Sequence, residues 1–205
     1  MADIKNIIFD MGGVLIRFDR HYFISRLGYS GEDEKILLRE VFLSLEWAQM
    51  DWGSIDEAGA LENIRARIPE RLHEAARRLL LMWERPILPI EGMEELIREL
   101  KEKGYHIFLL SNASVRQRDY WPRVPGNECF EDTLISSDVH LVKPQPEIYK
   151  LALEKFGIRA EESVFIDDSA WNAAAACGCG IHGFVFHDDM QELRDFLKGL
   201  GVRCR

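Results

Sequence analysis

The sequence lacks any apolar run long enough to cross a membrane. No segment of the 205 residues approaches the roughly 18 apolar residues that a membrane-spanning helix needs. The first residues, Met1 to Asn6, are polar and lead into a short apolar stretch, which does not resemble a signal peptide. We therefore expect no membrane partner.

An excess of positive charge is also missing. The chain carries 26 Lys and Arg against 35 Asp and Glu, for a formal net charge of −9. Proteins that bind nucleic acids or anionic membranes usually present basic surfaces, so neither partner is expected. An anionic substrate would have to be held locally, by a metal ion or by a few placed cations.

Cysteine and histidine are sparse and poorly spaced for metal binding. The four cysteines show neither zinc-site spacing nor a Cys-x-x-Cys pair, and the six histidines are scattered. The Cys177-Gly-Cys179 stretch is compatible with a soft-metal site, but reduced thiols where a helix runs into a loop are the favoured interpretation. Reduced thiols predict a cytoplasmic location.

What the sequence does contain is an alternation of short apolar strands and amphipathic helices, which is typical of a parallel α/β sheet. Met93, Leu96, Ile97 and Leu100 recur at the spacing of one helical face. Capping-box spacings at Ser54 and Asp188 predict two further helix starts. Strands are predicted at residues 6–9, 107–110, 134–135, 164–166 and 184–186, and a helix at 148–156.

The segment between the first two predicted strands is far longer than a usual connection. Its apolar residues recur at helical spacing, as in Leu38, Val41, Phe42 and Leu45. We therefore predict a Rossmann-like parallel-sheet core made of residues 1–15 and 88–205. An all-helical cap, residues 16–87, is inserted after the first strand.

Polar residues follow three of the predicted strands. In open α/β sheets the carboxyl ends of the strands form the edge where ligands bind. A carboxylate delivered there by a buried strand is costly unless a cation or hydrogen bonds compensate. The strand-end residues are Asp10, the pair Ser111-Asn112 and the pair Asp167-Asp168.

Two of these strands end in acids, which predicts a shared Mg²⁺ because hard cations prefer oxygen ligands. Lys143 follows the third strand in the stretch Leu-Val-Lys-Pro, where its charge can neutralise a bound anion. Carboxylate, hydroxyl, ammonium and metal together favour phosphoryl transfer, which depends mainly on positioning and charge neutralisation.

These motifs resemble those of the haloacid dehalogenase superfamily. The resemblance is strongest to its branch of small sugar-phosphate phosphatases similar to α-glucose-1-phosphatase, and it covers essentially the whole chain, cap included. The matching stretches are Ile8-Phe9-Asp10-Met11-Gly12-Gly13-Val14-Leu15, Leu110-Ser111-Asn112-Ala113, Lys143-Pro144-Gln145-Pro146-Glu147-Ile148-Tyr149 and Phe165-Ile166-Asp167-Asp168-Ser169.

The resemblance implies a role for each matched residue. Asp10 is expected to be the nucleophile that forms an aspartyl-phosphate intermediate. Ser111 and the Asn112 backbone are expected to hold phosphate oxygens, with Lys143 binding the phosphoryl group. The implied Mg²⁺ ligands are Asp10, the Gly12 carbonyl and Asp168, with Asp167 in support. The cap is expected to close over the sheet edge and exclude water.

One position departs from the family pattern. Phosphatases of this superfamily usually read Asp-x-Asp, and the second Asp protonates the leaving alcohol, but this chain has Gly12 there. General acid–base help is typically worth about 10²–10⁴-fold. We expect a narrow or slow phosphatase that prefers sugar 1-phosphates, whose anomeric alcohol leaves more easily. Asp51 and Trp52 are candidate cap residues for specificity, and Asp51 is one candidate for a replacement acid.

Two other functions stay open at this point. A non-catalytic member that binds a phosphorylated ligand or partner would explain Gly12, although the retention of Asp10, Lys143 and Asp168 opposes it. Dehalogenation uses the same Asp nucleophile, but displacing a halide from carbon needs no Mg²⁺, and the Asp167-Asp168 pair argues against it. The prediction is thus a Mg²⁺-dependent phosphatase of a small phosphorylated metabolite.

Overall fold

Five parallel strands form one sheet in the computed structural model, which describes residues 3–205. Residues 1–2, part of the predicted polar N-terminus and core segment, lie outside the described residues. The strands lie in the order β3-β2-β1-β4-β5, so β1 sits between β2 and β4. Their bounds are Asn6–Phe9 (β1), His106–Ser111 (β2), Asp132–Ile135 (β3), Ser163–Asp167 (β4) and His182–Val185 (β5).

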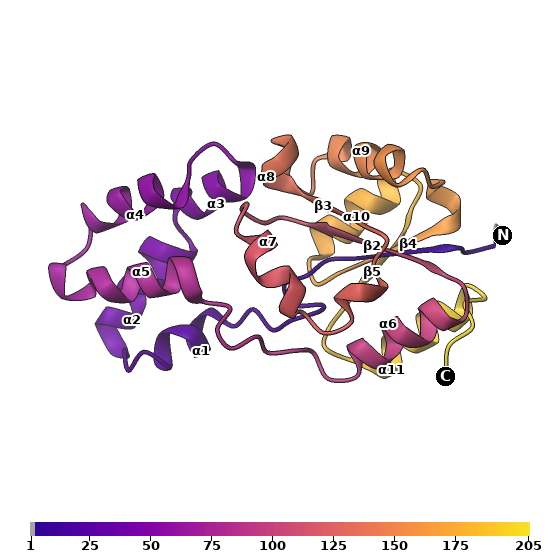
Figure 1. Ribbon diagram of the computed structural model, residues 1–205, viewed down its shortest axis with the longest axis horizontal. Coiled ribbons are helices and arrows are strands. Elements are labelled where there is room, and N and C mark those ends of the chain that lie inside the picture. The colour runs from indigo at the N-terminus through magenta and orange to yellow at the C-terminus, as the bar shows by residue number, and fades with distance from the viewer. Residues whose placement is uncertain (1–2) are drawn as a thin grey trace.

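Helices cover both faces of this sheet (Figure 1). Alternate residues of a strand point to opposite faces. Ile7 and Phe9 of β1 pack in one hydrophobic cluster with residues of α6 (Met93–Glu102) and α11 (Met190–Gly199). Ile8 packs in a second cluster with residues of α9 (Pro146–Phe156) and α10 (Ala170–Gly178). The predicted Rossmann-like α/β core is therefore confirmed.

The helices of residues 20–82, between β1 and α6, form a separate body beside the sheet (Figure 1). They bury their own hydrophobic cluster, which includes Leu37, Ile64, Leu72 and Leu79. This confirms the inserted helical cap. The exact boundaries between cap and core, after residue 15 and before residue 88, stay a prediction. The elements are α1 (Arg20–Ser25), α2 (Gly31–Leu37), a π-helical turn (Leu38–Phe42), α3 (Leu45–Trp52), α4 (Glu57–Arg65), a 3₁₀ turn (Glu70–Leu72) and α5 (His73–Met82).

Short helices follow two strands and approach the cap. Helix α7 (Gln117–Tyr120) comes after β2, and α8 (Ser136–Val139) follows β3 directly. The end of α3 packs on α8, which joins the cap to the sheet edge. Single 3₁₀ turns occupy Trp121–Arg123, Asn127–Cys129 and Ala160–Glu162.

Both capping-box predictions were wrong by one or two residues. Helix α4 begins at Glu57, and its N-cap is Asp56, because Ser54 donates its hydroxyl to the Gln49 carbonyl instead. Helix α11 has Asp189 as its N-cap. Asp188 adopts a positive φ of 60° and forms an ion pair with Arg17.

The fifth strand lies earlier than predicted, at His182–Val185 rather than 184–186. A Cβ at residue 183 would lie 2.3 Å from the Ala173 carbonyl oxygen, so Gly183 lets β5 approach α10 closely. A glycine weakens the strand signal in the sequence, and this explains the shift.

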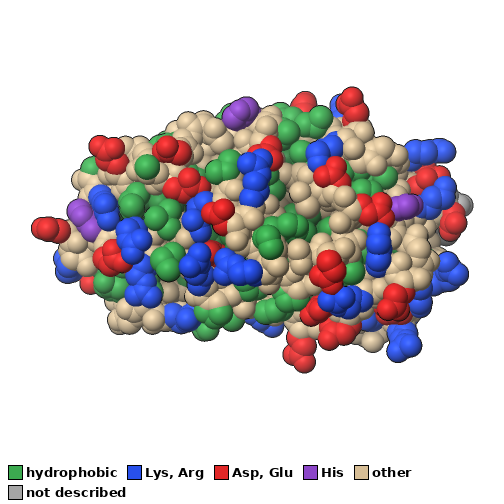
Figure 2. Space-filling model, in the orientation of Figure 1, with side chains coloured by type: hydrophobic (Ala, Val, Ile, Leu, Met, Phe, Trp, Pro, Cys, Tyr) green, Lys and Arg blue, Asp and Glu red, His purple; other side chains and the backbone are tan. Residues whose placement is uncertain are grey.

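Cations on the cap surface are largely paired with neighbouring acids. Figure 2 shows Lys and Arg side chains gathered over the cap helices, interspersed with Asp and Glu. Arg67 binds Glu46 and Glu40, and Arg77 binds Glu74. Among residues 3–205, no helix is both long enough and apolar enough to span a bilayer.

Candidate active site

The carboxyl ends of four neighbouring strands bring the candidate residues together. Asp10 directly follows β1, Ser111 ends β2, Ser136 follows β3 and Asp167 ends β4. Parallel pairing sets Phe9 opposite Leu109 and Ile166, so these strand ends reach one edge of the sheet. This is the edge at which ligands bind in open α/β folds.

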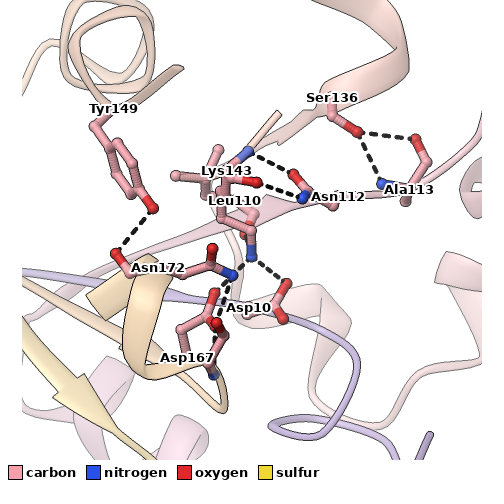
Figure 3. Close-up of polar contacts among 10 residues, drawn as sticks. Asp10, Leu110, Asn112, Ala113, Ser136, Lys143, Tyr149, Asp167 and Asn172 are labelled. Atoms are coloured by element: carbon pink, nitrogen blue, oxygen red, sulfur yellow. Dashed lines mark hydrogen bonds and ion pairs between the residues drawn. The ribbon is translucent and has the colours of Figure 1, made fainter. Parts of the chain in front are cut away.

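Lys143 lies between two carboxylates at this edge (Figure 3). Its Nζ is 2.7 Å from Asp10 Oδ1 and 2.7 Å from Asp167 Oδ2, and it donates to the Leu110 carbonyl at 3.1 Å. The side chain is only 1% exposed. Burial acts to lower its pKa, but the charges of Asp10 and Asp167 prevail and raise the pKa above its usual value. Lys143 is therefore a fixed, permanent cation.

Asn112 positions this lysine rather than offering its own side chain to a ligand. Its Nδ2 donates to the Lys143 carbonyl at 3.0 Å, and its Oδ1 accepts from the Lys143 amide at 2.8 Å (Figure 3). Asn112 and Ser111 both line the cavity above the sheet edge. Ser111 is 1% exposed.

Asp167 and Asp168 are adjacent in sequence but differ in surroundings. Asp167 is fully buried, and its Oδ1 accepts from the Ser169 amide at 2.8 Å and the Asn172 side chain at 2.9 Å. The backbone carbonyl of Asn172 accepts a hydrogen bond from the Tyr149 hydroxyl (Figure 3). Asp168 is exposed and lines the cavity. Asp168 is thus free to meet a ligand, whereas Asp167 supports Lys143.

Three carboxylates gather around the one ammonium. Oxygen atoms of Asp10, Asp167 and Asp168 lie within 4.8 Å of one another. Burial raises the pKa of Asp10 to about 6; Lys143 opposes this rise and the charge on Asp167 adds to it. Burial and Asp167 likewise raise the pKa of Asp168. The excess of negative charge and the all-oxygen donor set fit a hard divalent cation such as Mg²⁺.

The turn after β1 requires glycine at residue 13. Gly13 has a φ of +78°, and a Cβ there would lie 2.3 Å from Asp168 Oδ2. At Gly12, by contrast, a Cβ would make ordinary contact with Phe18, at 3.6 Å. The backbone of the turn therefore passes directly beside Asp168.

We expect Gly13→Ala to displace Asp168 and to lower turnover at least about 10²-fold, because errors near 1 Å in catalytic geometry have this cost. The matched control is Gly104→Ala. Gly104 has a φ of +87°, but its added Cβ would meet no described atom within 4 Å. Both variants bear the left-handed strain of about 1–2 kcal/mol. Thermal unfolding measures the backbone strain that both variants share, and steady-state kinetics measure the effect of the clash with Asp168. Equal activities of the two variants would contradict the prediction.

A cavity of about 250 Å³ lies between the sheet edge and the cap. Its sheet side includes Asp10, Ser111 and Asp168, and its cap side includes Trp47, Asp51 and Trp83. Trp47 packs against Phe18, whose ring also contacts Trp83. Aromatic rings therefore form part of the wall, and Asp51 is a carboxyl on the cap side.

Trp52 does not line this cavity. Its side chain is 47% exposed, and its Nε1 donates to the His140 carbonyl. The His140 ring in turn hydrogen-bonds the Trp52 carbonyl at 2.9 Å. Trp52 thus joins α3 to the residue after α8, whereas Asp51, its neighbour, reaches the cavity.

Sequence reasoning did not single out several residues of the site. Ser136 follows β3 at the same edge as Asp10, and this position was a usable signal. Asn172, one turn into the helix after Asp167, supports that carboxylate. Arg20 and Arg116 line the cavity from α1 and from the loop before α7, and nothing in their local sequence distinguished them from surface arginines.

Comparison with known proteins points to one family. A family model for haloacid dehalogenase-like hydrolases matches residues 4–180. A haloacetate dehalogenase of Moraxella sp. (strain B) is 26% identical over 213 aligned positions, covering 96% of this chain and 94% of the relative. A D-ribitol-5-phosphate phosphatase of Bacteroides thetaiotaomicron is 27% identical and covers 82% of this chain and 85% of its own length.

Solved structures include a similar enzyme. A HAD family enzyme from Bacteroides thetaiotaomicron, crystallised with magnesium and inorganic phosphate, is 27% identical, with a TM-score of 0.66. The match covers 93% of this chain and 98% of that one.

Proposed function

The chain belongs to the haloacid dehalogenase-like hydrolase family, and on this premise we propose that it is a Mg²⁺-dependent phosphomonoester hydrolase. Its substrate would be a small phosphorylated metabolite such as a sugar phosphate. The observation that carries the proposal is the cluster of Asp10, Asp167 and Asp168 around the buried Lys143. It faces a cavity that the cap covers.

Each residue of the cluster has a place in the proposed reaction. The Asp10 carboxylate attacks phosphorus, the bond from phosphorus to the leaving oxygen breaks, and an aspartyl phosphate forms on Asp10. The Ser111 hydroxyl and the Asn112 amide hold phosphate oxygens, and Lys143 balances their charge. Water then attacks the aspartyl phosphate, which releases inorganic phosphate and restores Asp10.

Mg²⁺ would be held by Asp10, Asp168 and the Gly12 carbonyl. When bound, it would neutralise charge on the phosphoryl oxygens. Asp167 would act indirectly, since its oxygens are already engaged by Lys143, Ser169 and Asn172. The relatives support this view, because one is a phosphatase of a sugar-alcohol phosphate and one structure contains both magnesium and phosphate.

Dehalogenation is the second candidate, because several relatives are haloacid dehalogenases. Displacement of a halide from carbon by Asp10 would need no divalent cation. The paired carboxylates of Asp167 and Asp168 would then add unbalanced negative charge next to an anionic substrate. We therefore favour the phosphatase.

We expect phosphate release to depend on Mg²⁺. The purified protein is assayed with ribitol 5-phosphate, glucose 1-phosphate, glycerol phosphate and p-nitrophenyl phosphate, with haloacetate as the halide-release control. Chelation of the metal is expected to lower turnover at least about 10²-fold, since a catalytic cation contributes several kcal/mol, and added Mg²⁺ should restore it.

Two results would overturn the proposal. Release of halide from haloacetate without metal, with no phosphate release, would identify a dehalogenase. Silence on every compound, with bound Mg²⁺ shown by calorimetry, would favour a protein that binds a phosphorylated ligand without turnover.

A further inference from the structure

Position 12, in the turn after β1, has no side chain that could donate a proton. Residue 12 is glycine, and a Cβ added there would make ordinary contact with Phe18, at 3.6 Å. The alkoxide that leaves phosphorus must nevertheless take up a proton, unless it is unusually stable. A donor, if the chain has one, must reach the cavity from another element.

Three carboxyl groups line the cavity, and two of them already have roles. Asp10 faces Lys143 as the nucleophile, and Asp168 belongs to the cation cluster. The third is Asp51, which comes from α3 of the cap. The charges of Asp10 and Lys143 act on its pKa across the cavity. It is therefore the one carboxyl of the cavity wall, among the described residues, that neither phosphorus nor the cation would engage.

The backbone around Asp51 is docked on the sheet edge. Ser136 donates its hydroxyl to the Asp51 carbonyl and accepts from the Ala113 amide at 3.0 Å. The Ser136 hydroxyl therefore connects Asp51 of the cap to Ala113, the residue that follows Ser111-Asn112. Gly53, with a φ of +74°, approaches α8 so closely that a Cβ would lie 2.4 Å from the Ser137 carbonyl oxygen. With the paired contacts of Trp52 and His140, these bonds fix the end of α3 over the site.

The surroundings of Asp51 favour its neutral form. Burial raises its pKa to about 7, the charge of Asp10 adds to the rise, and Lys143 and a hydrogen bond from Trp47 oppose it. The other ionisable groups that face the cavity near it are Tyr120, Arg116, Arg20 and Asp168. A carboxyl with this pKa can give a proton and take one back at neutral pH, which is the range where acid–base catalysis is most effective.

We propose that Asp51 is the general acid and base that replaces the missing side chain at Gly12. The inference rests on the proposed phosphatase function. As the bond from Asp10 to phosphorus forms and the bond to the alkoxide breaks, the Asp51 proton passes to the leaving oxygen. The resulting carboxylate accepts a proton from the water that attacks the aspartyl phosphate, which returns Asp51 to its starting form.

A protein with Asp51 as its general acid should hydrolyse a wider range of esters than a protein with no acid. Without an acid, only esters with good leaving groups would be hydrolysed well. With Asp51 as the acid, phosphates of ordinary alcohols such as ribitol 5-phosphate become substrates. A wild-type protein that hydrolyses p-nitrophenyl phosphate but none of the alkyl phosphates would overturn the role of Asp51 and leave the phosphatase proposal intact.

The decisive variant is Asp51→Asn, measured on two leaving groups. The value of kcat/KM reports the first chemical step, in which p-nitrophenolate needs no proton and an alkoxide does. We expect a loss of about 10²–10⁴-fold on ribitol 5-phosphate or glycerol phosphate, and a loss below about 10-fold on p-nitrophenyl phosphate. The variant should also show a burst of p-nitrophenol, because water attack on the aspartyl phosphate loses its base.

The pH profile provides an independent readout. For an alkyl phosphate, wild-type kcat/KM should fall above about pH 7 as Asp51 loses its proton. The corresponding fall should be missing in Asp51→Asn. A profile unchanged by the substitution would contradict the proposal.

Controls separate chemistry from structure. Glu62→Gln removes an exposed carboxylate of α4 that does not line the cavity, and it should leave both activities unchanged. Tyr120→Phe removes the phenol hydroxyl of the cavity wall, and the leaving-group dependence should survive it. Equal losses of Asp51→Asn on both esters, or no loss, would overturn the role of Asp51. If Asp51→Asn does not fold, Asp51→Glu must still lose more on the alkyl ester than on the aryl ester.

Discussion

Asp10→Asn is expected to abolish turnover, with a loss of about 10⁴–10⁶-fold, since an enzyme that loses its nucleophile retains only the effects of binding and positioning. Asparagine has the same shape as aspartate but cannot form an aspartyl phosphate. The position is buried, at 7% exposure, so an isosteric replacement keeps the packing of the turn after β1. Phosphate release from the best ester of the panel measures the effect.

The matched comparison for Asp10→Asn is Asp168→Asn. Both side chains belong to the carboxylate cluster, but only Asp10 is proposed to attack phosphorus. Raising the Mg²⁺ concentration should recover part of the activity of Asp168→Asn, because that variant weakens cation binding. It should recover none in Asp10→Asn. Recovery in both variants would mean that Asp10 is a ligand and not the nucleophile.

Lys143→Met is the prediction that combines stability with activity. The substitution leaves the Asp10 and Asp167 carboxylates without their shared ammonium inside the protein. Removal of one partner from a buried ion pair typically destabilises by about 3–5 kcal/mol. The loss of a cation next to the phosphoryl group should lower turnover by about 10²–10³-fold, as for a lost oxyanion contact.

Denaturant unfolding without metal and phosphate-release kinetics with Mg²⁺ test the two parts separately. The control is Lys150→Met on α9, whose side chain is exposed. It should change stability by less than about 0.5 kcal/mol. A Lys143→Met protein as stable as Lys150→Met would show that the carboxylates do not need the lysine for folding.

The relatives of this chain differ in the reaction that they catalyse. Haloacid dehalogenases and phosphatases both occur among proteins similar to this chain. An aspartate at the end of β1 can attack either carbon or phosphorus. We favour attack on phosphorus by Asp10, because a phosphoryl group needs a cation and the carboxylate cluster that includes Asp167 and Asp168 offers oxygen ligands for one.

The sequence by itself determined the elements that have a strong local cause. Short continuous apolar runs predicted β1, β2 and β4, and the polar residue at the end of each run located Asp10, Ser111 and Asp167. These predictions succeeded because a buried parallel strand and its carboxyl end leave a mark within a few residues. Gly12 likewise indicated that the turn after β1 lacks a second carboxyl group, and Asp168 was predicted as a member of the carboxylate cluster.

Only the tertiary structure decided which distant residues meet. The sequence suggested Asp51 and Trp52 together, yet one lines the cavity and the other binds His140, because neighbours on a helix point in different directions. The place of Ser136 between Ala113 and the Asp51 carbonyl depends on how the cap packs on α8. Such contacts join segments far apart in the chain, so no local pattern records them, and the packing of the cap alone sets the surroundings of Asp51.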